Sequence, residues 1–222
     1  MRRLRRAHPP VASVRDVSVD NTAAVSSQAT FDLPEYEADD VVVLFFYQDA
    51  GDGTLDTPTG WTLIDVIYAQ PDADYSVGSY YRKMDGSEGS TITLSYSGAV
   101  SDTRTIRARI ISCTDVTGEV EGDMQISSLS TDAEFPEVAL PWNEAATTII
   151  IAGVFIRDPE RLNGNIMTDD GYTSIFEGAN LNGFTKSERT DSVHPLGGPA
   201  TFSDSGTAAY WTTATIAVRG LK

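Results

Sequence analysis

The stretch VVVLFFY, residues 41–47, is seven apolar residues in a row, and TTIIIAGVFI at 147–156 has the same character. A strand with one face in water alternates apolar and polar side chains, so a strand without a polar face is covered on both sides. Both runs are also well short of the ~18 apolar residues that a membrane span requires. We predict that these two segments are central strands of a soluble protein, with no membrane partner.

Working outward from these runs, further apolar or alternating segments recur between clusters of Gly, Pro, Asp and Ser, a pattern typical of β-sandwiches and barrels. The only helical signal is a short turn at 158–164, where Pro159 can begin and Gly164 can end a helical turn. The sequence therefore predicts an all-β, jelly-roll-like, two-sheet antiparallel sandwich with an extended N-terminal arm. The predicted strands are 11–19, 25–32, 41–48, 61–68, 75–83, 90–96, 104–113, 124–130, 134–140, 147–157, 172–177, 183–190, 199–203 and 208–219.

The segment 104–113 alternates from Ile106 to Ile110. Ile106, Ala108 and Ile110 share one face, and Arg107 and Arg109 share the other. We expect the apolar face to point inward and the arginine face outward. The predicted basic stripe, which would meet an acidic neighbour, consists of Arg104, Arg107 and Arg109. Cross-strand pairing within one subunit is the alternative.

The chain divides into two similar halves, about 16–115 and 116–222, within one predicted domain spanning 16–222. Each half contains an apolar strand ending in Asp, then a Gly-aromatic-Thr triplet, a strand with basic residues, a Ser/Gly turn and a long closing strand. The triplets begin at Gly60 and Gly171. Two explanations stay open, a duplication and the similarity that any two sets of β-hairpins share.

Charge is divided unevenly between the predicted arm, residues 1–15, and the rest of the chain. The arm carries five arginines and no carboxylate, whereas the remainder carries 11 basic and 32 acidic residues, a net charge of −21. Such an acidic body repels nucleic acid, so no nucleic-acid partner is expected. We expect the arm to bind an acidic neighbour. The arginines predicted to act as tethers are Arg2, Arg3, Arg5 and Arg6.

A succession of motifs then narrows the class of protein. ADDVVVLFFYQD at 38–49 is followed by PTGWTLID at 58–65, by YSVGSYYRKMDGSEGSTITLSYSG at 75–98 and by TIRARIISCTDV at 105–116. This order resembles a family of β-sandwich proteins encoded among the structural genes of tailed bacteriophages. The similarity continues through TTIIIAGVFIRD at 147–158 and AAYWTTATIAVRG at 208–220.

The resemblance implies a non-enzymatic component of the virion, assembled in the host bacterial cytoplasm. The leading role is a capsid decoration or cement protein, with the major capsid protein or a neighbouring virion or tail protein as partner, and a homo-oligomer as the expected state. A tail or fibre component is the alternative within this class. A carbohydrate-binding or host-adhesion module is the alternative from another class.

The inventory of reactive residues predicts no catalytic site and no cofactor. The chain has two histidines, His8 and His194, and lacks a G-x-S-x-G elbow, an H-E-x-x-H motif and a Cys–His pair by spacing. Its one cysteine, Cys113, ends an apolar strand and is predicted to be a buried thiol.

Two weaker binding hypotheses rest on loops and aromatic residues. The loop DAGDGTLD at 49–56 offers hard oxygen ligands for Ca²⁺ from Asp49, Asp52 and Asp56, although it does not match an EF-hand; a flexible acidic turn is the alternative. A sugar-binding platform would need exposed aromatic residues, for which core packing is the alternative reading. The candidates are Tyr80, Tyr81, Trp142, Tyr172 and Trp211.

Overall fold

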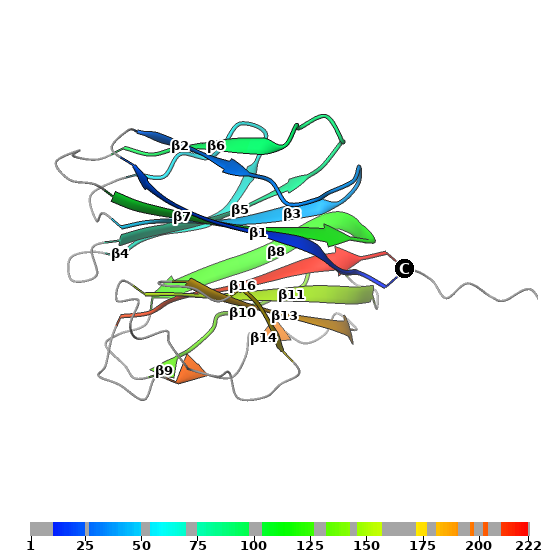
Figure 1. Cartoon of the computed structure of the whole chain (residues 1–222). Helices are drawn as coiled ribbons and strands as arrows, with labels where there is room; N and C mark the ends of the chain where they lie inside the picture. Colours follow the sequence, from blue (N-terminus) through cyan, green and yellow to red (C-terminus); the bar gives the residue numbers. More distant parts are fainter. Residues whose placement is uncertain are drawn as a thin grey trace, which may run out of the picture.

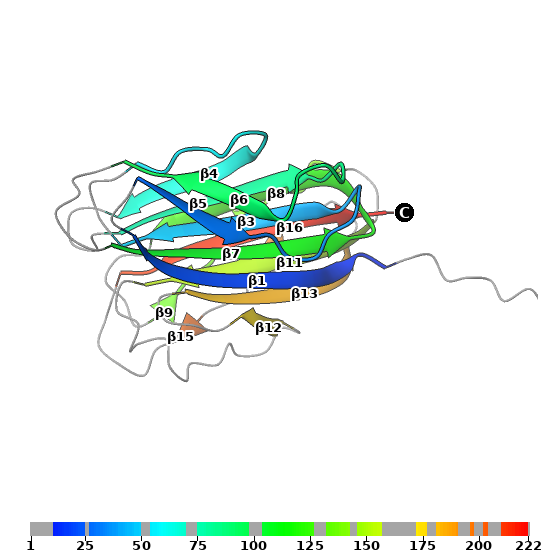
Figure 2. The ribbon, with the colours of Figure 1, turned by 45° about the horizontal axis from the view of Figure 1, so that its top comes forward.

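The computed structural model describes residues 11–24, 27–49, 54–69, 75–97, 104–126, 132–142, 146–156, 172–176, 181–190, 196–197, 202–203 and 210–221. The regular elements in this part of the chain are all β-strands, and their pairings are antiparallel. Figure 1 shows them as layers stacked on one another, and Figure 2 shows that the axes of the long strands are roughly aligned. The prediction of an all-β sandwich is confirmed.

The first large sheet is formed entirely by the N-terminal half of the chain. Its strand order is β1-β7-β3-β5-β4, so β3 is the central strand. The strands are β1 (Ser13–Ala24), β3 (Val41–Gln48), β4 (Thr62–Ala69), β5 (Tyr75–Lys83) and β7 (Arg104–Thr114).

The second large sheet is formed entirely by the C-terminal half. Its order is β8-β16-β11-β13-β12, with β11 central. In both sheets the order is therefore the first strand in the chain, then the last, the second, the fourth and the third. The strands are β8 (Val116–Ile126), β11 (Ala146–Phe155), β12 (Thr173–Phe176), β13 (Leu181–Thr190) and β16 (Thr212–Gly220).

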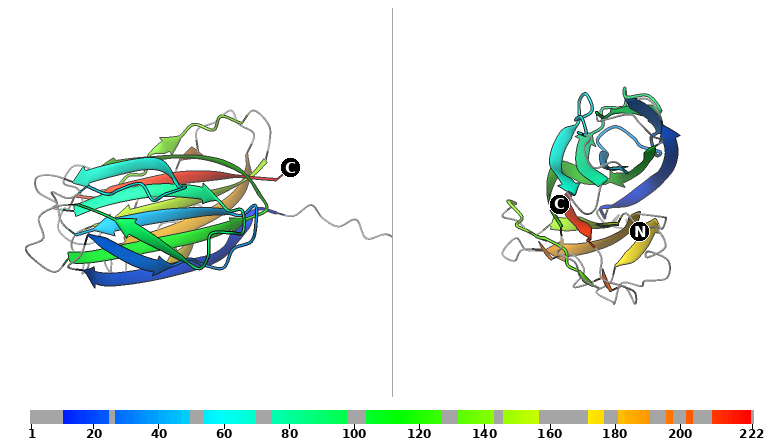
Figure 3. Two further views of the ribbon diagram at one scale, coloured as in Figure 1. Left: turned by 90° about the horizontal axis from the view of Figure 1, so that it is seen from above. Right: turned by 90° about the vertical axis from the view of Figure 1, so that its left-hand side faces the viewer.

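Smaller strand pairs cover the outer face of each sheet, as the views in Figure 3 show. In the N-terminal half, β2 pairs with β6, so the pairs β1–β7, β2–β6 and β3–β5 are nested. In the C-terminal half, β9 pairs with β15 and β10 with β14, in the corresponding positions of the chain. Nested pairing is compatible with the jelly-roll part of the prediction, which itself remains a prediction. The strands are β2 (Gln28–Asp32), β6 (Thr91–Ser95), β9 (Asp132–Ala133), β10 (Glu137–Val138), β14 (Leu196–Gly197) and β15 (Phe202–Ser203).

Both all-apolar segments are central strands covered on two sides, as predicted. The odd-numbered residues of β3 pack in the core between the large sheets, and its even-numbered apolar residues pack under β2 and β6. Across the central core, the rings of Phe45 and Phe155 meet edge to face at 5.4 Å. The hydroxyls of Tyr75 and Thr212 form a 2.8 Å hydrogen bond between the sheets. Each half thus contributes one sheet to a shared core.

A bulge in the edge strand β4 closes one side of the sandwich. The register with β5 shifts between Leu63 and Asp65, so Ile64 is the extra residue. Its side chain lies against Gly122 of β8, where an added Cβ would come within 2.8 Å of it. Gly122 therefore allows the edges of the two sheets to approach closely.

The largest difference from the predicted strands is at β8. We predicted a strand at 124–130, whereas β8 begins at Val116 and ends at Ile126. Most of β8 is exposed or half-buried, because it is the edge strand of the second sheet. Its many polar residues obscured the strand signal. The predicted helical turn at 158–164 lies outside the described residues.

Candidate functional site

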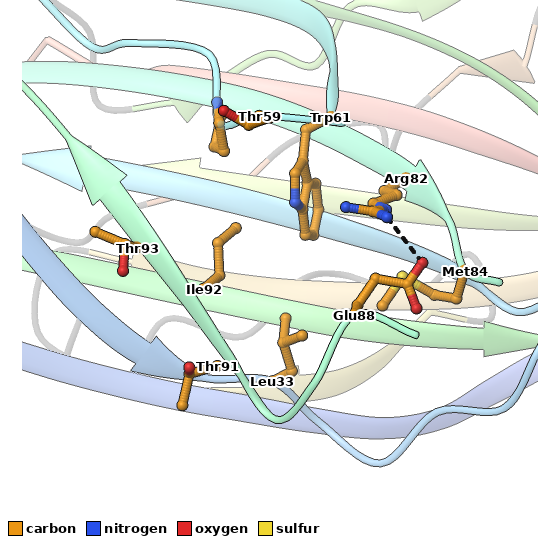
Figure 4. A pocket seen from close by; sticks show the side chains of 10 residues that line it. Leu33, Thr59, Trp61, Arg82, Met84, Glu88, Thr91, Ile92 and Thr93 are labelled. Atoms are coloured by element: carbon orange, nitrogen blue, oxygen red, sulfur yellow. Dashed lines mark ion pairs between the residues drawn. The ribbon is translucent and has the colours of Figure 1, made fainter. Parts of the chain in front are cut away.

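A cleft of about 300 Å³ opens in the N-terminal half, between the β2–β6 layer and the first large sheet. Figure 4 shows that its walls come from four parts of the chain: the residue after β2, the loop before β4, the end of β5 with the turn that follows, and β6. The lining mixes apolar and polar residues. They are Leu33, Pro58, Thr59, Trp61, Arg82, Met84, Glu88, Thr91, Ile92 and Thr93.

An ion pair stands on one wall of this cleft. Arg82 Nη2 lies 3.0 Å from Glu88 Oε1, and the Glu88 side chain is only 4% exposed. The Glu88 carboxylate also accepts hydrogen bonds from the main-chain N–H groups of Asp85 at 2.9 Å and Gly86 at 3.1 Å. Charge-assisted bonds of this kind hold a carboxylate in one orientation. The turn after β5 is therefore fixed to the wall of the cleft.

Gly60 makes room for Arg82. It has a φ of +81°, in the left-handed region that favours glycine, and an added Cβ would lie 2.8 Å from Arg82 Nη1. The turn is closed by a hydrogen bond from the Trp61 N–H to the Pro58 carbonyl at 3.0 Å. This turn places the half-buried Trp61 ring in the cleft, into which it points in Figure 4.

The free edge of β6 borders the cleft. In an antiparallel pair, opposite residues alternate between exchanging hydrogen bonds and directing both main-chain groups away from the partner. The Leu33 N–H donates to the Ser90 carbonyl, so Leu33 and Ser90 are a hydrogen-bonded pair. In the register of β2 and β6, the pairs Asp32–Thr91 and Thr30–Thr93 are therefore of the other kind, whose main-chain groups point away from the partner strand. The N–H and C=O groups of Thr91 and Thr93 therefore point away from β2, and both residues line the cleft.

The segment 54–56 shows how this edge can be used. The outward carbonyl of Ser95 accepts a 3.0 Å hydrogen bond from the Asp56 N–H, and the Ser97 N–H donates to the Thr54 carbonyl at 2.9 Å. The chain then turns away at Pro58, before it reaches the edge positions of Thr93 and Thr91. The cleft begins where this short extra strand ends.

A second polar site surrounds Arg15, which we had counted as part of the basic arm but which lies in β1. The register between β1 and β7 shifts between Val14 and Asp16, so Arg15 is the extra residue of a bulge, a device that redirects a side chain. Its Nε donates to Asp40 Oδ2 at 2.7 Å, and its guanidinium also reaches Glu37 at 3.2 Å and the Thr114 hydroxyl at 3.0 Å.

The hydrogen bond to Asp40 is the largest cause that raises the pKa of Arg15. The Asp40 side chain is only 4% exposed, so this arginine and a nearly buried carboxylate form a firm contact between the N-terminal segment and the body. We call the set of Arg15, Glu37, Asp40 and Thr114 the arginine niche.

The predicted outward basic stripe is wrong for Arg109. Arg109 is completely buried, and it lies on the face of β7 that carries Ile111 and Cys113 into the core between the sheets. Arg107, on the same face, is half-buried, and burial is the main cause that lowers its pKa. The alternation was predicted correctly, but both faces of the first sheet are covered, so neither points to solvent. Arg104 is in β7, and its side chain is outside the described part.

The predicted tethers Arg2, Arg3, Arg5 and Arg6 and both histidines lie outside the described residues. So does Asp52, while Asp49 is half-buried and Asp56 exposed. The described residues contain no cluster of three or more potential metal ligands, and this leaves the Ca²⁺ hypothesis on Asp49, Asp52 and Asp56 untested. No helix in the described ranges is long and apolar enough to cross a membrane.

Cys113 is fully buried, as predicted, and burial raises the pKa of its thiol to about 12. The sugar platform is wrong for three of its five aromatic residues, because Tyr80, Trp142 and Trp211 are buried. Tyr81 and Tyr172 are half-buried and pack against the cores.

Sequence reasoning missed the cleft, because its walls come from segments that are separated in the sequence. The pairing of Arg82 with Glu88 in the cleft wall follows from the fold and not from the spacing of these residues in the sequence. Neither the comparison with protein-family models nor the search of curated proteins found a match for this chain.

Proposed function

We propose that this protein is a non-enzymatic structural component of a tailed-phage particle, a capsid decoration or cement protein held in place by its basic N-terminal arm. The setting comes from the resemblance of its motif order to phage structural proteins. The role of the arm comes from charge, since Arg2, Arg3, Arg5 and Arg6 precede an acidic body. The proposed partner is the major capsid protein or another virion protein with an acidic surface.

The observation that carries the proposal is the arginine niche. Arg15, the arginine of the basic segment that lies in the described part of the chain, binds two carboxylates and a hydroxyl of the body. The body thus holds this arginine through acidic side chains of the loop before β3. Arg2, Arg3, Arg5 and Arg6 would make the same type of contact with a neighbour. Single exposed pairs contribute only about 0–1 kcal/mol, so the tether depends on several arginines and on repeated copies.

The test is incorporation into particles. Changing Arg2, Arg3, Arg5 and Arg6 together to Gln should leave the body folded and reduce the amount of protein in purified particles. The difference from wild type should be larger at low salt than at high salt, where the arginine contacts of the wild type are already screened. The matched control changes the same four residues to Lys, which keeps the charge and should load close to normally. Equal loading of all three proteins would contradict the tether.

Electron microscopy of particles separates the roles within the proposal. Copies on the head would support a decoration protein, and copies confined to the tail would favour the tail or fibre component.

A further inference from the structure

The edge of β6 at the cleft has the geometry of an acceptor for an additional strand. The outward N–H and C=O groups of Thr91 and Thr93 follow on the same edge as the Ser95 carbonyl, which the segment 54–56 already uses. Residues two apart on one edge are about 6.6 Å apart, the spacing at which an extended peptide forms its next hydrogen bonds. Strand addition of this kind is a common mode of peptide recognition, in which the main chain supplies affinity and the pockets supply specificity.

The cleft walls indicate the side chains that such a peptide would carry. Ile92 points into the β2–β6 core between Thr91 and Thr93, and Leu33 and Met84 complete an apolar wall opposite the Trp61 ring. An apolar side chain of the incoming strand would be buried there.

The charges at the two ends of the cleft are negative. Asp56 lies exposed where the segment 54–56 ends, and Asp85, also exposed, precedes the Glu88 turn at the other end. Hydrogen bonds from Ser87 are the main cause that lowers the pKa of Asp85, so this carboxylate stays ionised. The one positive group of the cleft, Arg82, is already paired with Glu88. The ends thus favour an apolar residue flanked by basic ones.

We propose that the cleft receives the segment Arg2–Arg6 of a second copy of this chain as an additional strand beside Thr91–Thr93. In an extended strand, Leu4 would face the apolar wall, while Arg2 and Arg6, about 6.6 Å to either side, would reach toward the acidic ends. The stiff His8-Pro9-Pro10 sequence favours an extended approach. This inference rests on the proposed function of the arm as a tether and names the surface that the arm binds.

A second copy is the source we expect because the arm and the cleft wall lie on different sides of the central strand β3 in one subunit. The arm precedes β1, an edge strand of the first sheet, whereas Arg82 in the cleft wall belongs to β5, beyond β3. A contact between the arm of one subunit and the cleft of the next is head-to-tail, so it builds rings or rows of subunits.

The test is the association of the full-length protein measured by sedimentation velocity over a range of concentrations. Thr93→Pro removes the outward N–H from the cleft edge, a position where proline is tolerated in an edge strand. The matched control is Thr30→Pro. Thr30 is paired with Thr93 across the two strands, and the two hydroxyls form a 3.1 Å hydrogen bond. The N–H of Thr30, however, points to the other edge of the same two-stranded sheet. We expect Thr93→Pro to weaken association about tenfold and Thr30→Pro to change it less than about threefold.

Leu4→Asp provides a variant in the arm itself. It should weaken association as much as Thr93→Pro does, and the two changes combined should cost no more than either alone. A full-length protein that is monomeric at every concentration, or equal effects of Thr30→Pro and Thr93→Pro, would overturn the inference.

Particle loading distinguishes this failure from failure of the proposed function. If the change of the four arginines to Gln reduces loading while Thr93→Pro and Leu4→Asp do not, the arm is a tether that binds elsewhere, and the cleft assignment is wrong. If the arginine changes have no effect on loading, the proposed function itself fails.

Discussion

Replacing Asp40 tests whether the arginine niche fastens the N-terminal segment to the body. Asp40 Oδ2 accepts hydrogen bonds from Arg15 Nε at 2.7 Å and from the Glu37 N–H at 2.9 Å, and the Ser112 hydroxyl lies 3.4 Å away. A hydrogen bond with a charged partner contributes about 1.5–3 kcal/mol, and a buried group that loses its partner adds a penalty. We expect Asp40→Ala to lower the free energy of unfolding by about 3 kcal/mol.

Asp40→Asn is the informative control because it keeps the size and one acceptor oxygen. It should retain the bond to the Glu37 N–H and lose the charge that holds Arg15, which lowers the free energy of unfolding by about 1–2 kcal/mol. Urea unfolding followed by tryptophan fluorescence and circular dichroism measures both values. A parallel Arg15→Met variant completes a double-mutant cycle.

The cycle isolates the contact between the arginine and the carboxylate. Because the Arg15 side chain is about one-quarter exposed, solvent weakens the pair, and we expect a coupling energy of about 1–2 kcal/mol. A coupling below about 0.5 kcal/mol would mean that the two side chains act independently. The arginine niche could then no longer serve as the model for how the arm binds an acidic surface.

Further expectations concern the shared core. Native protein should leave the buried Cys113 unmodified by iodoacetamide at pH 8, and protein in denaturant should react; modification of the folded protein would contradict the fold. Phe155→Ala, which removes the ring that meets Phe45, should cost about 3–5 kcal/mol in urea unfolding, and a loss below 1 kcal/mol would contradict the packing. Burial raises the pKa of Tyr75 from 10.0 to about 12, so the folded protein holds this proton more tightly than the unfolded chain. The stabilisation is complete below pH 10 and is lost as the pH rises toward 12, and Tyr75→Phe should remove part of this alkaline loss; an unchanged pH profile would refute it.

The sequence predicted the layers of this fold because hydrophobic pattern and layer position are directly linked. A run such as 41–47 has no polar face, so it has to be covered twice, and both such runs are the central strands of their sheets. The ends of β3 and β5 were predicted to the residue, since Asp40 and Met84 mark sharp changes in composition.

The hydrophobic pattern did not predict the burial of the arginine face of β7. An alternating pattern distinguishes the two faces of a strand but does not indicate what covers each face. The arginine face was assigned to solvent, yet a sheet that packs on both sides has no solvent face. A long arginine stem can pack among apolar residues, and Arg109 directs an N–H to the carbonyl of Ala108 at 2.9 Å.

The candidate cleft was beyond sequence reasoning because it depends on register. Which edge of β6 is free follows from the hydrogen bond between Leu33 and Ser90, and the position of Arg82 against Glu88 follows from a turn geometry that Gly60 permits. None of these is a property of residue type or spacing alone.

The edges of the strands also explain why a basic segment is the expected occupant of the cleft. Proteins protect edge strands with bulges and charges, and β1 and β4 each contain a bulge, at Arg15 and Ile64. By contrast, β6 pairs with β2 without a register shift, and its edge past Ser95 is bordered by acidic residues. Another acidic body would be repelled from this edge, whereas a short cationic strand would be attracted, so the charges select the arm over non-specific edge-to-edge pairing. Raising the salt concentration should therefore weaken association of the wild-type protein and reduce the difference between wild type and Leu4→Asp.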